Sequence, residues 1–343
     1  MTRCLRVATA PEPLPTLFHP PADSLLEPAF LERPMTRDTL LLVEKCSHCL
    51  SYYDLESGKR TASIVLDHFP HEFVIDAAAK NAYVGHYGVE TSGHVGTGGT
   101  SIFHIDIPGR ALKRTIDVAP FNRLHGLQID AHDRLYALSE DRAELAVIAH
   151  PDIDSAPCRA VATGGIKSHL FALTRDGQTA YVMNLLSHTV TKVRPYEPLV
   201  APVACSPGEK PEGCVLSDDE RTLYVTNRWS DTLSAIDTDT MTVKYAATSR
   251  NDATRLYRWR DGRLLATNYG DRSLSVIDPA TLKELACIPM QARPIALSYH
   301  PTRPLAFVSQ DDDTLGYFNM ESLTFERTIA TQREPDVSRV VSL

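Results

Sequence analysis

The sequence predicts an all-β protein, a seven-bladed β-propeller of four-stranded blades. Three observations support this prediction. Short runs rich in β-branched and aromatic residues alternate with turns from Thr39 onward, and no segment keeps a helical period. The same pattern returns about every forty residues, the length of one four-stranded blade. The last residues, Glu334 to Leu343, have the pattern of a first strand with no blade after it.

The repeat occurs in seven copies. The clearest begins at Thr222 with Thr-Leu-Tyr-Val-Thr-Asn and ends in Leu-Ser-Ala-Ile-Asp, and copies at Thr39 and Leu264 match it without a gap. Looser copies begin at Ala82, Leu135, Ala180 and Ala306. The copy at Thr39 lacks a first strand, so we expect the C-terminal strand to join the first blade and close the ring. Closure removes the sheet edges that an open array would expose.

Composition and patterning predict one propeller domain over residues 36–343. Residues 1–35 are rich in Pro and Leu and lack strand alternation, so we expect an N-terminal extension packed on the outside of the domain. The net charge of −8, without a long basic run, argues against a nucleic-acid partner. No apolar stretch is long enough to cross a membrane, and the N-terminus lacks the apolar core of a secretory signal. We therefore expect a cytoplasmic protein that acts on a small molecule, with its oligomeric state undetermined.

The repeat also resembles a known family. The pairs Leu-Tyr-Val-Thr-Asn with Leu-Ser-Ala-Ile-Asp (223–237) and Ala-Thr-Asn with Val-Ile-Asp (266–278) resemble those of the YVTN-repeat, lactonase-like seven-bladed propellers. The resemblance covers roughly residues 36–343. It implies the propeller fold and a function within a group that includes lactonases, lyases, surface proteins and binding modules. The chain departs from the pattern at Leu138-Ser139-Glu140, where the Asn motif would fall, and at a long insert in the second blade.

The first strand of each propeller blade lines the central channel, and its opening residue points into the mouth. Across the seven copies this position is occupied by His71, His125, His169, Glu212, Thr254, Ile295 and Asp336. Three histidines on neighbouring blades, flanked by two carboxylates, match the general form of a catalytic divalent-metal site. We expect His71, His125 and His169 to hold the ion, with Glu212 or Asp336 as a further ligand, and cannot distinguish Zn, Fe, Mn, Ni and Cu. The alternatives are a polar, water-filled channel and a ligand site without metal.

A second ring of side chains is expected where the second strands end at the same face. It contains Glu44, His86, Ser139, Asn184, Asn227, Asn268 and Gln310. The three asparagines belong to the repeat and are expected mainly to hold the following loops, with substrate contact as the alternative. His86 and Glu44 break the Asn pattern beside the histidines, so they join Asp336 as candidate catalytic groups. Arg255 directly follows the ring position Thr254, and we expect it to contact an anionic substrate.

The Gly-rich insert, residues 85–100, follows the second strand of the second blade. It is no P-loop, because no Gly-Lys-Ser/Thr follows and no helix begins there. On the open face of a propeller it would form a flexible lid beside His71 and His86. A plain long hairpin is the alternative interpretation.

These features predict a divalent-metal-dependent enzyme acting on a small oxygenated metabolite at the channel mouth. Hydrolysis of a lactone or ester, or a related lyase or isomerase step, suits a metal that polarises a carbonyl or activates water. The alternative is a non-catalytic propeller that binds a ligand or a peptide through exposed rim aromatics such as Trp229 or Tyr269.

Overall fold

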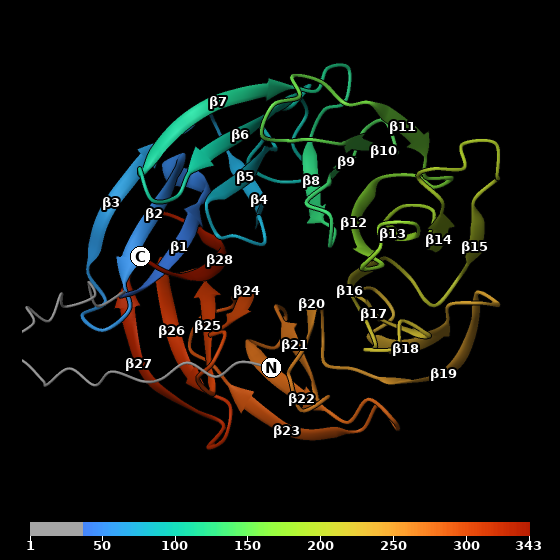
Figure 1. Ribbon diagram of the computed structural model, residues 1–343. Coiled ribbons are helices and arrows are strands. Elements are labelled where there is room, and N and C mark those ends of the chain that lie inside the picture. The colour runs from blue at the N-terminus through green and yellow to red at the C-terminus, as the bar shows by residue number, and fades with distance from the viewer. Residues whose placement is uncertain (1–36) are drawn as a thin grey trace, which may run out of the picture. The chain divides into compact units, whose positions relative to one another are not determined.

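A computed structural model describes residues 37–343. These residues form seven four-stranded antiparallel sheets around a central axis (Figure 1). The prediction of a seven-bladed propeller is confirmed. The predicted packing of residues 1–35 on the outside lies beyond the described residues.

Each blade is described from its innermost strand outward. Blade 1 contains β28 (Pro335–Ser342), β1 (Asp38–Glu44), β2 (Cys49–Asp54) and β3 (Arg60–Val65), with a 3₁₀ turn, η1, at Lys45–Ser47. Blade 2 contains β4 (Pro70–Ile75), β5 (Asn81–His86), β6 (Ser101–Asp106) and β7 (Ala111–Asp117). Blade 3 contains β8 (Leu124–Ile129), β9 (Leu135–Ser139), β10 (Glu144–Ile148) and β11 (Arg159–Ala162). Blade 4 contains β12 (Ser168–Leu173), β13 (Ala180–Asn184), β14 (Thr189–Val193) and β15 (Val203–Cys205).

The remaining three blades follow the same order. Blade 5 contains β16 (Pro211–Leu216), β17 (Thr222–Asn227), β18 (Thr232–Asp237) and β19 (Thr242–Thr248). Blade 6 contains β20 (Ala253–Arg258), β21 (Leu264–Asn268), β22 (Ser273–Ile277) and β23 (Glu284–Pro289). Blade 7 contains β24 (Pro294–Tyr299), β25 (Leu305–Gln310), β26 (Thr314–Asn319) and β27 (Thr324–Ala330).

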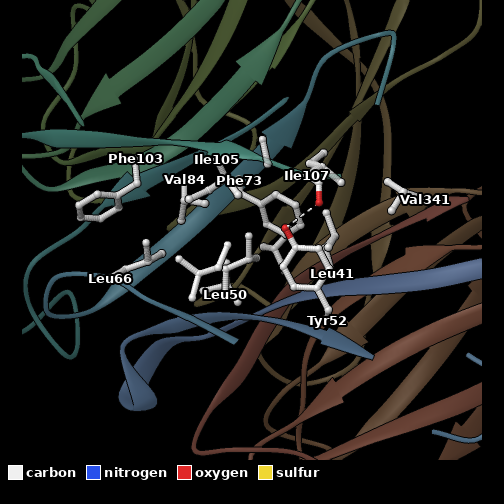
Figure 2. Close-up of a cluster of buried hydrophobic side chains, with 14 of the residues drawn as sticks. Leu41, Leu50, Tyr52, Leu66, Phe73, Val84, Phe103, Ile105, Ile107 and Val341 are labelled. Atoms are coloured by element: carbon white, nitrogen blue, oxygen red, sulfur yellow. Dashed lines mark hydrogen bonds between the residues drawn. The ribbon is translucent and has the colours of Figure 1, made fainter. Parts of the chain in front are cut away.

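The hydrophobic core is divided among the interfaces between neighbouring blades. Side chains alternate between the two faces of a strand, so one apolar strand packs against both neighbours. In β1, Leu40 and Leu42 face blade 7, whereas Leu41 and Val43 face blade 2. Figure 2 shows the interface of blades 1 and 2, where the Tyr52 hydroxyl donates a hydrogen bond to the Ile107 carbonyl at 3.3 Å. Inner and middle strands are therefore buried on both faces, which explains their nearly continuous apolar runs.

The ring closes through the C-terminal strand, as predicted. β28 pairs antiparallel with β1, with Thr39 opposite Val341 and Leu42 opposite Ser338. Arg37 and Leu343 exchange two further backbone hydrogen bonds beyond the ladder, at 2.7 and 3.0 Å. Blade 1 is thus built from both ends of the described chain, and β28 pairs the edge that β1 would otherwise expose.

A repeated turn positions the start of the inner strands. Six of the seven are preceded by a non-glycine residue with a φ between 49° and 60°. These residues are Phe69, Arg123, Lys167, Lys210, Asp252 and Glu334. The carbonyl of the turn residue accepts a backbone hydrogen bond from the loop after the second strand, as from Glu140 to Arg123 and from Leu185 to Lys167. This left-handed conformation is uncommon for such residues, and the carbonyl contact fixes it at the channel mouth.

Candidate functional site at the channel mouth

Each predicted ring residue is the second residue of its inner strand. Six of the seven side chains are buried and Ile295 is half-buried. The buried six are His71, His125, His169, Glu212, Thr254 and Asp336. The pairing register shifts directly after the strand opening in all seven blades, so the mouth is irregular in the same way all round. The structure therefore brings the three histidines and both acids to one end of the channel.

The three imidazoles form a stack. The ring centroids of His71 and His125 are 4.2 Å apart, and those of His125 and His169 are 3.5 Å apart. Tyr87 presents its edge to His71 and His125, at 5.4 and 5.2 Å. Burial, reinforced by the two neighbouring imidazoles, holds the pKa of His125 well below its ordinary value. His125 is therefore a neutral imidazole at physiological pH.

Asp336 is the partner of His71. Its Oδ2 lies 2.7 Å from His71 Nδ1, an ion-pair distance, although the angle is poor for a hydrogen bond. Burial alone would raise the pKa of Asp336, but His71 and Lys45 outweigh it and hold the pKa well below the usual range. Asp336 is thus an ionised, buried carboxylate that fixes the orientation of His71.

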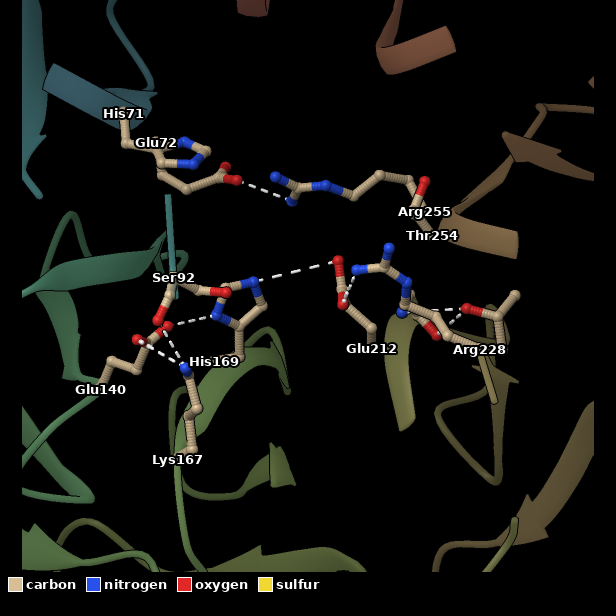
Figure 3. A network of polar contacts seen from close by, with 12 residues as sticks. His71, Glu72, Ser92, Glu140, Lys167, His169, Glu212, Arg228, Thr254 and Arg255 are labelled. Carbon is tan, nitrogen blue, oxygen red and sulfur yellow. Dashed lines mark hydrogen bonds and ion pairs between the residues drawn. The ribbon is translucent and has the colours of Figure 1, made fainter. Parts of the chain in front are cut away.

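Glu140 is the corresponding partner of His169, and sequence reasoning missed it. Its Oε2 lies 2.5 Å from His169 Nδ1, and its carboxylate also accepts a hydrogen bond from the Tyr87 hydroxyl at 3.0 Å. Lys167 Nζ and Arg123 Nη1 lie 3.9 and 3.6 Å from Oε1. Burial would raise the pKa of Glu140, but His169 and Lys167 outweigh it and lower the pKa below its ordinary value. Both ends of the histidine stack therefore carry ionised carboxylates. Figure 3 shows the one at His169.

Glu140 could have been found from its position, because it directly follows Ser139 of the predicted second ring. Side chains alternate along a strand, so residues that follow the second strands point toward the mouth instead of into their own blades. These residues are Lys45, Tyr87, Glu140, Leu185, Arg228, Tyr269 and Asp311. Of these, Tyr87 and Glu140 contact the histidine stack, and Arg228 contacts Glu212 at 2.6 Å.

The predicted second ring turns toward the blade interiors. The Asn184 amide donates to Thr191 Oγ1 at 3.1 Å, and its oxygen accepts from Ser168 at 2.7 Å. Asn227 and Asn268 make equivalent bonds to hydroxyls of their own blades. All three side chains are fully buried, and substrate contact through them stays a prediction.

Glu44 and His86 also face their own blades. The Glu44 carboxylate accepts from Ser51 at 2.5 Å, from Tyr53 at 2.6 Å and from the Gln332 backbone at 2.7 Å. His86 packs on Phe103 with 5.4 Å between ring centroids, and burial lowers its pKa. Neither has a hydrogen bond or ring contact with the histidine stack, and a catalytic role for them stays a prediction.

Glu212 and Arg255 are both engaged by other charges. Glu212 Oε2 lies 2.6 Å from Arg228, while its Oε1 lies 3.9 Å from His169 Nε2. Arg255 Nη1 lies 2.6 Å from Glu72 Oε1, and this ion pair crosses the channel between β20 and β4 (Figure 3). Both residues of that pair directly follow ring positions, so it lies one residue deeper than the histidines.

The Gly-rich insert reaches the rims of blades 3 and 4. Arg123 donates to the carbonyls of His94 and Gly96 at 2.5 and 2.8 Å, and Lys167 donates to the carbonyl of Ser92 at 2.6 Å. Gly98 has a φ of 74°, and a Cβ there would lie 2.4 Å from Arg123 Cγ, so only glycine fits this approach. The same two cations that approach Glu140 therefore hold the insert beside the histidines.

Comparisons with known proteins establish the fold alone. No protein-family model and no curated protein sequence matches the chain. A periplasmic gluconolactonase from Pseudomonas aeruginosa, PpgL, superposes with a TM-score of 0.71 at 17% identity, over 89% of this chain and 99% of that one. A functionally unknown protein from Desulfotomaculum acetoxidans DSM 771 gives 0.70 at 12% identity, over 88% and 98%. The dihydro-heme d1 dehydrogenase NirN in complex with DHE gives 0.64 at 13%, over 88% and 74%.

The chain shares the propeller fold with enzymes. The specific resemblance to YVTN-repeat proteins has no matching family model behind it and stays a prediction.

The chemistry of the donor set fits a divalent transition metal. His71 and His169 direct Nδ1 at carboxylates, the arrangement that orients histidine ligands in metal sites and leaves Nε2 as the donor atom. Within residues 37–343, Nε2 of His71, His125 and His169 makes no hydrogen bond. The stacked rings do not converge on one point, and no group of three such side chains among the described residues is arranged around a common centre. Metal binding therefore requires the rings to separate.

Proposed function

We propose that the chain is a divalent-metal-dependent hydrolase acting on a lactone or ester at the channel mouth. One observation supports this most. Two buried, ionised carboxylates, Asp336 and Glu140, lie next to Nδ1 of the two outer histidines, and the central histidine, His125, is neutral. His71, His125 and His169 would hold the ion, with Glu212 as a fourth candidate ligand. When bound, the metal would polarise the carbonyl and lower the pKa of a water. The propeller fold shared with a gluconolactonase supports the same reaction class.

The remaining residues of the mouth have separate roles in this proposal. Glu140 accepts a hydrogen bond from Nδ1 of His169, and Asp336 lies at ion-pair distance from Nδ1 of His71, so both carboxylates favour the tautomer with its lone pair on Nε2. The Tyr87 hydroxyl stays protonated, because burial and the neighbouring Glu140 charge raise its pKa far above neutrality, and it donates to Glu140. Lys167 and Arg123 hold the insert across the mouth and so limit the access of water.

The charges at the rim favour a polar or anionic substrate. Lys210 stacks over Trp229 at 5.1 Å, and no acidic partner approaches it within 4 Å among residues 37–343. Burial, followed by the nearby Arg228, lowers the pKa of this ammonium group, and a bound anion would relieve that cost. We therefore place the substrate's anionic or hydroxyl-rich end toward blade 5.

Metal analysis of protein purified without a histidine tag tests the proposal. We expect about one equivalent of a transition metal after loading, and hydrolysis of glucono-1,5-lactone or a related lactone above the spontaneous rate. His125→Ala should lose both, whereas His68→Ala, at an exposed histidine, should lose neither. No stoichiometric metal together with unchanged activity in His125→Ala would contradict the proposal and favour a non-catalytic binding propeller.

The location of the activity is a separate prediction. No helix within residues 37–343 has the length and hydropathy to span a membrane. We retain the cytoplasm as the predicted compartment.

A further inference from the structure

A cavity lies at the opposite end of the channel from the histidines, where the inner strands end. Its volume is about 420 Å³, and all seven inner strands contribute to its wall. Its inner limit includes Glu72 and Arg255, the ion pair that crosses the channel below the histidines. The volume is that of a small-molecule site, and none of the proposed metal ligands lines it.

The charges in this cavity do not balance. Arg255 and Arg339 line it as cations, against the single carboxylate of Glu72. A further cation at its wall, Arg258, is already paired with Asp218. Arg339 has no acidic partner within 4 Å among residues 37–343, and its one side-chain hydrogen bond goes to the adjacent Ser338 carbonyl at 2.9 Å. The cavity therefore carries one uncompensated positive charge.

Arg339 is half-buried at the cavity wall. Its guanidinium lies over the ring of Phe73 at 5.9 Å, and burial lowers its pKa, with Glu72 offsetting only part of the effect. A desolvated guanidinium is stabilised most by a carboxylate that accepts two parallel N–H bonds. No Asp or Glu among residues 37–343 supplies that carboxylate to Arg339.

Two tyrosines line the cavity with apolar ring surface, and Tyr257 also offers a hydrogen-bond donor. The Tyr257 oxygen accepts a backbone hydrogen bond from Leu297 at 2.9 Å, which leaves its own hydroxyl hydrogen to donate. Burial raises the pKa of Tyr257 to about 12, so the hydroxyl is protonated at neutral pH. Tyr299 has a buried hydroxyl without any partner among the described residues. Together with Leu170, these rings form apolar walls around the cations.

We propose that this cavity binds a small organic monocarboxylate, with its carboxylate on Arg339 and Arg255 and its apolar body between Tyr257 and Tyr299. One negative charge balances the one uncompensated cation, whereas a phosphate dianion would meet the Glu72 carboxylate as well. The site is independent of the proposed hydrolase activity, because the ion pair between Glu72 and Arg255 separates it from the histidines.

Binding of benzoate to the full chain, measured by calorimetry, tests the proposal. We expect a Kd on the order of 1 mM for a ligand of this size, and no binding of benzylamine, which has the same body and the opposite charge. Arg339→Gln should weaken benzoate binding about tenfold or more, and Arg339→Lys should weaken it less. Arg258→Gln is the matched control, because Asp218 already neutralises that cation, and His125→Ala should bind benzoate as the wild type does.

Two results would overturn the proposal: no benzoate binding by the wild type, or binding that Arg339→Gln leaves unchanged. Crystals of the unmodified protein soaked with 4-bromobenzoate give a test that needs no folded variant. An anomalous bromine signal between Tyr257 and Tyr299 supports the site, and a signal confined to other places overturns it.

Discussion

Two buried carboxylates decide which nitrogen of their histidines carries the proton. Glu140 and Asp336 each face Nδ1, so the Nδ1–H tautomer is favoured in His169 and His71 and the lone pair is left on Nε2. Without these acids, either nitrogen could carry the proton. At the scale of single residues, the mouth is therefore already arranged to present unprotonated nitrogen atoms.

The substitution Glu140→Gln should uncouple His169 from this arrangement. An amide cannot hold the Nδ1 proton as a carboxylate does, so we expect affinity for the bound metal to fall about 10- to 100-fold. Calorimetric titration with Zn²⁺ and Mn²⁺ measures the change, and circular dichroism checks the fold. Glu144→Gln, on the same blade but paired with the exposed Arg142, serves as the control. Equal metal affinity in Glu140→Gln and wild type would show that the carboxylate does not orient a ligand.

At the scale of elements, the insert after β5 is held by contacts from other blades. Arg123 and Lys167 reach its backbone carbonyls from the turns before β8 and β12. The insert contains no regular strand of its own between Tyr87 and Thr100. The two cations and the Asn122 side chain, which donates to the Thr97 carbonyl at 2.5 Å, supply the side-chain contacts that hold it, so we expect an element of low local stability.

The substitution Arg123→Met should release the insert while the propeller stays folded. Endoproteinase Glu-C cleaves after Glu90, an exposed residue within the insert. We expect cleavage there to accelerate at least several-fold in Arg123→Met, with Arg142→Met as the control, because Arg142 makes no contact with the insert. Mass spectrometry of the products identifies the cut. An unchanged rate after Glu90 would mean that other contacts hold the insert.

The repeat made the strands and the ring positions predictable, but it did not predict the side-chain contacts at the channel mouth. The ring positions from His71 to Asp336 follow from counting, because the period is regular and every inner strand begins in the same way. Glu140 was missed because the candidate ring was placed at the last strand residue, Ser139, although alternation directs the next side chain toward the mouth. The stacking of His125 on His169 depends on rotamers, and the pairing of Glu72 with Arg255 depends on contact across the ring. Neither leaves a local sequence signal.

At the scale of the whole molecule, the strand that closes the ring contributes both to the stability of the propeller and to the site at the channel mouth. β28 completes blade 1, and its second residue, Asp336, is the partner of His71. Removal of β28 would expose the edge of β1 and would also remove Val341, which packs between blades 1 and 2. One strand thus contributes both to the core and to the histidine stack.

A chain truncated after Arg333 should fail to form a stable monomer, because the ring cannot close. We expect aggregation or a much lower melting temperature, measured by size-exclusion chromatography and circular dichroism. Adding a synthetic peptide of residues 334–343 should restore a monomer, while a peptide of the same composition in scrambled order should not. A truncated chain that melts like the full chain would show that β28 is dispensable.

The ion pair between Glu72 and Arg255 also affects how small molecules can move along the channel. It crosses the channel one residue below the histidines, so a molecule passing from the mouth to the opposite cavity would have to displace it. While the pair stays intact, the open route from the histidines leads back through the mouth, past the insert. Product and incoming substrate would then share one entrance.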